Sequence, residues 1–434
     1  MPEVLKQAER ADRTRAEIVE AARSLFSARG YRSVSLREIA RQAGISHPAL
    51  LKHFPNRDLL LTHVLEYYAP IDIGSVADTR TGSGEPELPF ARVAAQTETN
   101  TDYRAFSATM VGEAAAVTHP GHTAFRERAL DFRRKSTAIL ESAQSEGLVD
   151  PGRVCASEAL RLAAAWDSLH VIERYLPQRV DVAAMLREHQ RKLRLPVGYR
   201  TGHPREAFTP SVVRMPLLVE VPEPGSQPAY RSGRERRERI IANAMELFAR
   251  TGYVDTSVRD IAQSVGLTKS ALFNYFPTKD ALLAAVLTER DRRIDALTAA
   301  EEPWNTANFL RGLAKGAFLN HRDQPGLVEL YSVLSGEAVS VDHAAHQYFQ
   351  HRFRVTLAGF TLLFEEVARS GELSTERDPR HEALWLLALW DGLQYQWLYD
   401  RDGVDVASEL RAHLLDVLPV SNTEPLDTPV RQGA

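Results

Sequence analysis

Apolar residues recur with the period of an α-helix at two places far apart in the chain. In the first, Ile18, Ala21, Ala22, Leu25 and Phe26 occupy positions i, i+3, i+4, i+7 and i+8. This spacing places them on one face of a helix. The same pattern returns at Ile240, Ala244, Leu247 and Phe248. Each stretch predicts an amphipathic helix that packs through one face.

Signals for a second helix follow each amphipathic stretch. Ser35 precedes Glu38 by three residues, and Ser257 precedes Asp260 in the same way. A hydroxyl at the N-cap with a carboxylate at the third helical position satisfies backbone donors that would otherwise lack partners. We therefore expect short helices to begin after Ser35 and Ser257.

A sharp turn and a third helix are predicted next in both places. Gly44 and Gly266 can adopt the positive φ that ends a helix, and Ser46 and Thr268 can cap the following one. A Phe-Pro pair then closes the third helix, because a proline disfavours helical geometry in the residue before it. These signals are typical of a helix-turn-helix.

The two places belong to an internal repeat. At an offset of 222 residues, 18–66 and 240–288 share 20 of 49 positions without a gap. A fainter match continues at an offset of 224, with Gly112-Glu113-Ala114 over Gly336-Glu337-Ala338 and Trp166-Asp167 over Trp390-Asp391. The whole unit is therefore duplicated.

A proline-rich stretch separates the two copies. Residues 195–233 hold seven prolines and no sustained helical period, so they are expected to form a linker, whose apolar run 212–221 could pack on a surface. The expected domains are a helix-turn-helix domain at 10–67, a helical regulatory domain at 88–194, the linker at 195–233, a second helix-turn-helix domain at 234–290 and a second regulatory domain at 303–418.

Composition adds little to this organisation. The chain has 44% hydrophobic and 25% charged residues and a net charge of −4, as an ordinary globular protein does. Residues 1–60 are nevertheless basic, with 11 Lys/Arg against 7 Asp/Glu, as are residues 230–282, with 9 against 6. The charged N-terminus does not look like a signal peptide, no long apolar run predicts a membrane span, and the single Cys155 offers no disulfide. A cytoplasmic location is expected.

The repeated segment resembles the DNA-binding domain of the TetR family. The pattern that carries the resemblance is G-Y-x-x-x-S-x-R-x-I-A-x-x-x-G-[IL]-[ST]-x-x-A-L-x-x-[HY]-F-P-x-[RK]-D-x-L-L, and both copies contain it. The downstream helices resemble the family more loosely. The resemblance implies an all-α fold with two TetR-like units, each a three-helix DNA-binding domain followed by a helical regulatory domain, packed as a single-chain pseudo-dimer.

The resemblance also implies which residues meet DNA. In this motif, exposed side chains near the start of the second helix of the pair reach base edges in the major groove, and flanking groups contact phosphates. The base-reading candidates are Ser46, His47, Pro48, Ala49, Lys52 and His53, and in the second copy Thr268, Lys269, Ser270, Ala271, Asn274 and Tyr275. The flanking candidates are Ser35, Arg37, Arg57, Ser257, Arg259 and Lys279. A tyrosine that the family commonly uses on phosphate is replaced here by Leu51 and Phe273.

By the same resemblance, the regulatory domains would enclose a small-molecule effector that changes the separation of the reading helices. The candidate lining residues are Tyr103, Phe106, Met110, Glu113, His119, His122, Phe125 and Trp166, and in the second copy Tyr331, Glu337, His343, His346, Phe349, Trp390, Tyr395 and Trp397. Aromatic residues at helical spacing also occur in plain cores. The pairs His119/His122 and His343/His346 could suggest a metal site, but no third ligand is evident, and neither a metal nor a cofactor is expected.

The duplication predicts how the units assemble and act. Helices at 154–175, 182–193, 379–399 and 406–415 are expected to form a seam between the halves, so that one chain presents both reading helices. Because the reading faces HPALLKH and KSALFNY differ, the chain is expected to bind an operator with two unlike half-sites. Repression that is relieved by the effector is the expected outcome, and further association of chains is left open.

Two other classes of function compete with this interpretation. A helical adaptor or ligand-binding protein with vestigial DNA binding is the alternative, favoured if Lys52, Arg57 and Lys269 prove dispensable. Enzymatic activity is not expected, because the sequence contains no nucleophile elbow, glycine-rich phosphate loop or metal signature.

Overall fold

The computed structural model describes residues 2–68, 88–201, 231–299, 305–323 and 325–419, and helices are the regular elements found in them. The all-α fold predicted from the sequence is confirmed. Most of the linker, including its apolar run 212–221, lies outside the described residues. The division into five domains at the bounds given above stays a prediction.

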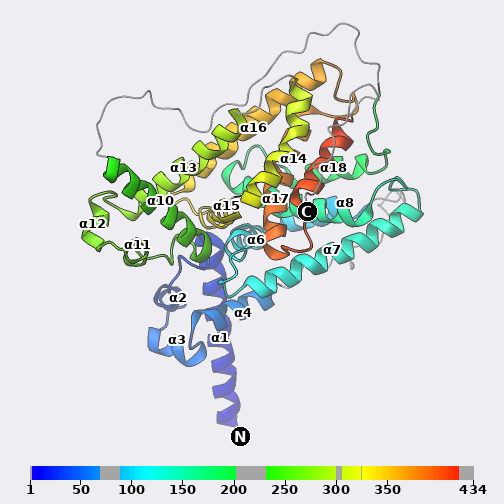
Figure 1. Cartoon of the computed structure of the whole chain (residues 1–434). Coiled ribbons are helices and arrows are strands. Elements are labelled where there is room, and N and C mark those ends of the chain that lie inside the picture. Colours follow the sequence, from blue (N-terminus) through cyan, green and yellow to red (C-terminus); the bar gives the residue numbers. More distant parts are fainter. Residues whose placement is uncertain (1, 69–87, 202–230, 300–304, 324, 420–434) are drawn as a thin grey trace.

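Nine helices make up the described part of the first unit (Figure 1). The first head contains α1 (Pro2–Arg29), α2 (Leu36–Gln42), α3 (His47–His53) and α4 (Arg57–Tyr67). The first body contains α5 (Phe90–Glu98), α6 (Thr101–Glu113), α7 (His122–Ser145), α8 (Cys155–Tyr175) and α9 (Val182–Lys192).

The second unit repeats this order. The second head contains α10 (Arg231–Thr251), α11 (Val258–Ser264), α12 (Lys269–Phe273) and α13 (Lys279–Ala299). The second body contains α14 (Thr306–Asp323), α15 (Pro325–Glu337), α16 (His346–Arg369), α17 (Pro379–Tyr399) and α18 (Val406–Val417). The sequence repeat is therefore a repeat of nine helices in the described residues.

Each head is held by the apolar face that the sequence predicts. In the first head, Ile18, Phe26 and Ile39 are fully buried with Leu50 and Phe54. Burying side chains of this size contributes roughly 1.5–3 kcal/mol each. The second head buries the corresponding Ile240, Phe248, Ile261, Leu272 and Phe276. The two heads thus share one core plan.

The two bodies pack against each other through α8 and α17, which make the most extensive helix–helix contact. This pair belongs to the predicted seam. The backbones approach so closely that a Cβ added to Gly392 of α17 would lie 1.8 Å from the carbonyl oxygen of Ala164 in α8. Helices α9 and α18 flank the pair, and their side chains form ion pairs with the opposite body. Only glycine therefore allows the contact at position 392.

A second crossing, which the sequence analysis did not predict, joins α6 and α15 directly. Gly112 and Gly336 meet there, since a Cβ on Gly112 would lie 2.5 Å from the Cα of Gly336. In Figure 1 the second head, with α12, lies at the left of the molecule, the first head, with α3, lies at the lower left, and the bodies lie toward the right. None of the described helices is long and apolar enough to cross a membrane.

Candidate nucleic-acid interface

The first reading helix is α3, and its bounds agree with the predicted segment HPALLKH. Gly44 adopts φ +69° in the turn before it, and the Ser46 hydroxyl accepts a hydrogen bond from the Ala49 N–H at 3.3 Å. Leu50 anchors the helix in the core. The base-reading candidates Ser46, Pro48 and Lys52 are exposed, and His47, Ala49 and His53 are partly exposed. This face is therefore accessible to a duplex.

The second reading helix is shorter than predicted. Helix α12 ends at Phe273 because the Tyr275 N–H bonds to the carbonyl of Leu272 at 3.0 Å, which tightens the last turn. Asn274 is exposed at the C-cap, and Tyr275 is partly exposed beyond it. The other candidates of this face, Thr268, Lys269 and Ser270, are exposed, with Ala271 partly exposed.

The predicted N-caps are present in both heads. The Ser35 hydroxyl accepts from the Glu38 N–H, and the Glu38 carboxylate accepts from the Ser35 N–H at 2.9 Å. The bonds from Ser35, aided by Arg29, lower the pKa of Glu38 to about 2. Ser257 and Asp260 form the same box. Both serines, with Arg37 and Arg259, remain exposed, so their phosphate contacts stay predictions.

The two cations at the start of the fourth helices bond within their own heads. Arg57 Nη1 donates to the carbonyls of Tyr31, Arg32 and Val34 at 3.0–3.2 Å, and its guanidinium lies 4.2 Å from the centre of the Tyr31 ring. Lys279 Nζ donates to the Val254 carbonyl at 3.2 Å. Both side chains fix the loop between the first two helices, and only their other N–H groups are left for phosphate.

The heads contact each other through Arg32, whose side chain is 3% exposed. Its Nη1 donates to Asp255 Oδ2 at 2.6 Å and to the carbonyl of Thr251, both in the second head. Its Nε lies 3.3 Å from Glu337 Oε1. At the offset of 222, Arg32 corresponds to Val254. The second head therefore has no equivalent arginine, and this contact between the heads is not duplicated.

Two buried carboxylates lie beneath the heads, next to the α6–α15 crossing. Glu113 accepts from the Arg32 N–H at 3.2 Å, and Glu337 accepts from the Tyr253 N–H at 2.9 Å. Burial raises the pKa of Glu113 to about 7 and that of Glu337 to about 8. The last residue of α6 and the last residue of α15 thus each hold the turn between the first two helices of the head in the same unit.

A cavity opens in the first body at its boundary with the second. It lies between Val111 of α6, part of α7, Trp166 and Asp167 of α8, and Gln396 and Tyr399 of α17. Its remaining lining residues are Phe125, Arg128, Ala129, Asp131, Phe132, Lys135 and Ala163. Both units therefore build its wall.

Polar groups in this cavity can still accept hydrogen bonds. Gln396 Nε2 donates to Asp167 Oδ2 at 2.9 Å, whereas the buried Gln396 Oε1 has no hydrogen-bond partner. Burial raises the pKa of Asp167 to about 6. The Tyr399 hydroxyl donates to the Val111 carbonyl at 2.7 Å, one residue before Gly112. A ligand bound here would thus lie beside Val111, the residue that precedes Gly112 of the α6–α15 crossing.

Only part of the predicted ligand-binding set lines the cavity. Phe125 and Trp166 do. Tyr103, Phe106, Met110, Glu113, His119 and His122 of the first unit lie elsewhere, as do Tyr331, Glu337, His343, His346, Phe349, Trp390, Tyr395 and Trp397 of the second. Arg128 was not predicted, because the candidate lining residues were aromatic, acidic, histidine and methionine side chains. Gln396 and Tyr399 went unrecognised because each copy was treated alone.

The histidine pairs make local contacts. His122 Nδ1 bonds to the Ala114 carbonyl and His346 Nδ1 to the Ala338 carbonyl, each at 2.8 Å. His119 Nε2 lies 3.6 Å from Glu113 Oε2. Among the described residues, no group of three or more His, Cys, Asp or Glu side chains is placed to hold a metal ion.

The equivalent region of the second body carries larger side chains at two positions. At the offset of 224, Phe353 replaces Ala129 and Tyr331 replaces Ser107, and both are buried. The Tyr331 hydroxyl donates to Asp391 Oδ2 at 3.0 Å, the group equivalent to Asp167. The two bodies therefore differ at this site.

Comparisons with known proteins agree with the duplicated heads. The family model "Bacterial regulatory proteins, tetR family" matches residues 18–64 and again 240–286. The transcriptional regulator TtgR of Pseudomonas putida is 26% identical over 205 residues, which is 43% of this chain and 93% of that protein. The transcriptional repressor KstR of Mycobacterium tuberculosis is 33% identical over 107 residues, or 24% of this chain and 46% of that protein.

Among solved structures, a TetR-family regulator from Agrobacterium tumefaciens is 20% identical and covers 43% of this chain and 98% of its own, with a TM-score of 0.38. The family model and the curated relatives are the findings that decide the assignment. The chain belongs to the TetR family of helix-turn-helix transcription regulators and contains two TetR-like units in tandem.

Proposed function

We propose that one chain acts as a complete repressor, which binds an operator with two unlike half-sites and is released by a small-molecule effector. A supporting observation is that α3 and α12 both lie toward the left of the molecule (Figure 1) and carry different exposed residues. Two identical subunits cannot optimise contacts to unlike half-sites, because each base contact is set by the side chain that faces it.

The junction between the heads supports the claim that one chain suffices. Family members place two reading helices in successive major grooves, about 34–36 Å apart. Here Arg32 joins the heads, and the α6–α15 crossing fixes the helices beneath them. A second chain is then not needed to complete the DNA-binding surface.

The cavity in the first body is the proposed effector site. Four of its twelve lining residues are aromatic, and the Asp167 carboxylate and the free Gln396 Oε1 are acceptors. We expect a compact ligand with an apolar body and a hydrogen-bond donor, such as a hydroxyl group. Because Phe353 and Tyr331 are larger than the residues that they replace in the first body, one effector per chain is expected.

Selection of bound DNA from a random pool, with the mass of the complex measured alongside, tests this proposal. One chain on a site with two different halves is the expected result. A perfect palindrome bound by two chains would contradict it.

A further inference from the structure

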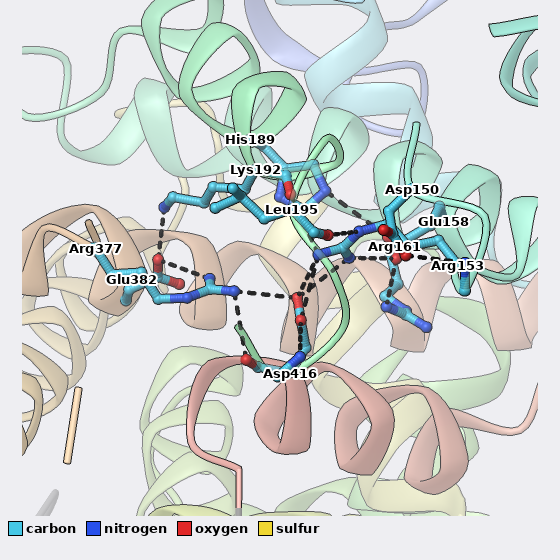
Figure 2. Close-up of polar contacts among 12 residues, drawn as sticks. Asp150, Arg153, Glu158, Arg161, His189, Lys192, Leu195, Arg377, Glu382 and Asp416 are labelled. Atoms are coloured by element: carbon cyan, nitrogen blue, oxygen red, sulfur yellow. Dashed lines mark hydrogen bonds and ion pairs between the residues drawn. The ribbon is translucent and has the colours of Figure 1, made fainter. Parts of the chain in front are cut away.

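Charged side chains buried between the two bodies form one cluster, part of which Figure 2 shows. We call it the seam cluster. Seven of its side chains are less than a tenth exposed, and Glu409 is 15% exposed. The members are Arg153, Glu158, Arg161 and Lys192 of the first unit and Arg377, Glu382, Glu409 and Asp416 of the second.

Three pairs in the cluster cross from one body to the other. Lys192 Nζ lies 2.5 Å from Glu382 Oε1, and Arg161 Nε lies 2.8 Å from Glu409 Oε2. Arg153 Nη1 lies 3.2 Å from Asp416 Oδ2. A charge that is removed from water is strongly unfavourable unless an opposite charge compensates it. Each body therefore depends on the other to neutralise its buried charges.

Two carboxylates of the cluster, Glu382 and Asp416, have lowered pKa values, as do the neighbouring His189 and His413. Burial alone would raise the pKa of Glu382, but Lys192 and Arg377 outweigh it and hold the pKa at about 2. Burial lowers the pKa of His413 to about 3 and that of His189 well below its ordinary value. The charge count of the cluster therefore rests on its arginines, its lysine and its carboxylates.

The two copies agree at some cluster positions and differ at others. At the offset of 224, Arg153 corresponds to Arg377 and Glu158 to Glu382. Lys192, by contrast, corresponds to Asp416, which has the opposite charge. Two further positions are charged in one copy only, with Arg161 opposite Trp385 and Glu409 opposite Met185.

These differences decide which bodies can pair. Pairing of a first with a second body gives four cations and four carboxylates. Two first bodies in the same arrangement would bury six cations with two carboxylates. Two second bodies would bury two cations with six carboxylates. Only the unlike pair is balanced.

We propose that the seam cluster is a pairing code, by which a first body accepts only a second body as its partner and rejects a copy of itself. The second body can come from the same chain or from another copy of the chain. Discrimination of this kind combines attraction in the right pair with uncompensated charge in the wrong pairs. Duplication followed by change at three positions thus yields two surfaces that fit each other.

The full chain with a protease site inserted between residues 202 and 230 tests the proposal. After cleavage, the two pieces are unfolded together in urea, refolded and weighed by native mass spectrometry. Mixed pairs should exceed like pairs by at least about tenfold, whereas random association would give about half mixed pairs. Like pairs at the random proportion would overturn the proposal.

The charge reversal Arg161→Glu with Glu409→Arg separates pairing specificity from mere stability, because it keeps this cross-body ion pair with its two charges exchanged. It leaves the mixed pair balanced but also gives each like pair four cations and four carboxylates. The cleaved pieces should therefore remain associated, while like pairs rise toward the random proportion. If this variant kept the wild-type excess of mixed pairs over like pairs, the proposal would be refuted.

Two single variants complete the test. Asp416→Lys leaves the mixed pair with five cations and three carboxylates, so the cleaved pieces should dissociate at lower urea concentration. Asp402→Lys makes the same change in an exposed turn between α17 and α18 and should leave pairing unaltered. Equal effects of the two variants would also count against the proposal.

Discussion

Replacement of Glu337 by glutamine removes a buried ionisable group beneath the second head with little change of shape. Glu337 is 1% exposed, and its Oε1 accepts no hydrogen bond, although Arg32 Nε lies 3.3 Å away. Burial raises its pKa from 4.5 to about 8. The folded protein therefore holds a proton on Glu337 that the unfolded chain releases.

The sign and size of the effect follow from this shift. The stabilising contribution of the protonated carboxyl is complete below about pH 4.5 and is lost as the pH rises through about 8. A shift of about 3.5 units at roughly 1.4 kcal/mol per unit sets an upper bound of about 5 kcal/mol. Relaxation and the weakened Arg32 contact should reduce the measured gain from Glu337→Gln to about 1–3 kcal/mol at pH 8.5.

Urea unfolding of wild type and Glu337→Gln at pH 5, 7 and 8.5 measures this gain. The two free energies of unfolding should differ least at pH 5 and most at pH 8.5. Buried histidines such as His119 contribute equally to both proteins and cancel in the difference. Glu127→Gln, at an exposed position of α7, is the control. If the free energies of unfolding of wild type and Glu337→Gln differed by the same amount at all three pH values, the reasoning would be refuted.

Four further substitutions have defined expectations. Lys269→Ala should relax base preference in one half-site only, by about 1–3 kcal/mol if the side chain pairs with guanine. Binding to operator variants altered in either half-site measures this preference. An equal loss in both halves would indicate a phosphate contact instead. Gly392→Ala should lower the melting temperature, because its Cβ would lie 1.8 Å from the Ala164 carbonyl oxygen, whereas Gly316→Ala, which meets no atom within 4 Å, should stabilise by about 0.5–1 kcal/mol. Ala129→Phe should fill the cavity, so that an effector found by calorimetric screening no longer binds while operator affinity is kept; undiminished effector binding would show that the ligand sits elsewhere.

Local signals in the sequence were sufficient to predict the heads. The capping residue Ser46 and the turn at Gly44 lie where the structure begins α3. Caps, glycine turns and apolar periodicity act over a few residues, so they can be recognised without knowledge of the tertiary structure. The early end of α12 was not predictable, because a hydrogen bond between neighbouring residues decides it and the residue pattern permits a longer helix.

Contacts between the units could not be derived from either copy alone. The crossing at Gly112 and Gly336 follows from the way the bodies dock, and the glycines gave no local signal of it. Gln396 enters a cavity that belongs mainly to the other unit. Arg32 replaces the Val254 of the other copy, a difference whose meaning depends on the Asp255 and Glu337 beside it. Such features depend on long-range geometry.

Site-directed cleavage of DNA tests most directly whether one chain presents two different reading helices to one operator. Lys52→Cys places an exposed thiol on α3, Asn274→Cys places one at the C-cap of α12, and the native Cys155 is buried. With a cleavage reagent on the introduced thiol, each variant is incubated with the selected operator. We predict that Lys52→Cys cuts one half-site and Asn274→Cys cuts the other. Cleavage of both halves by each variant would contradict the account.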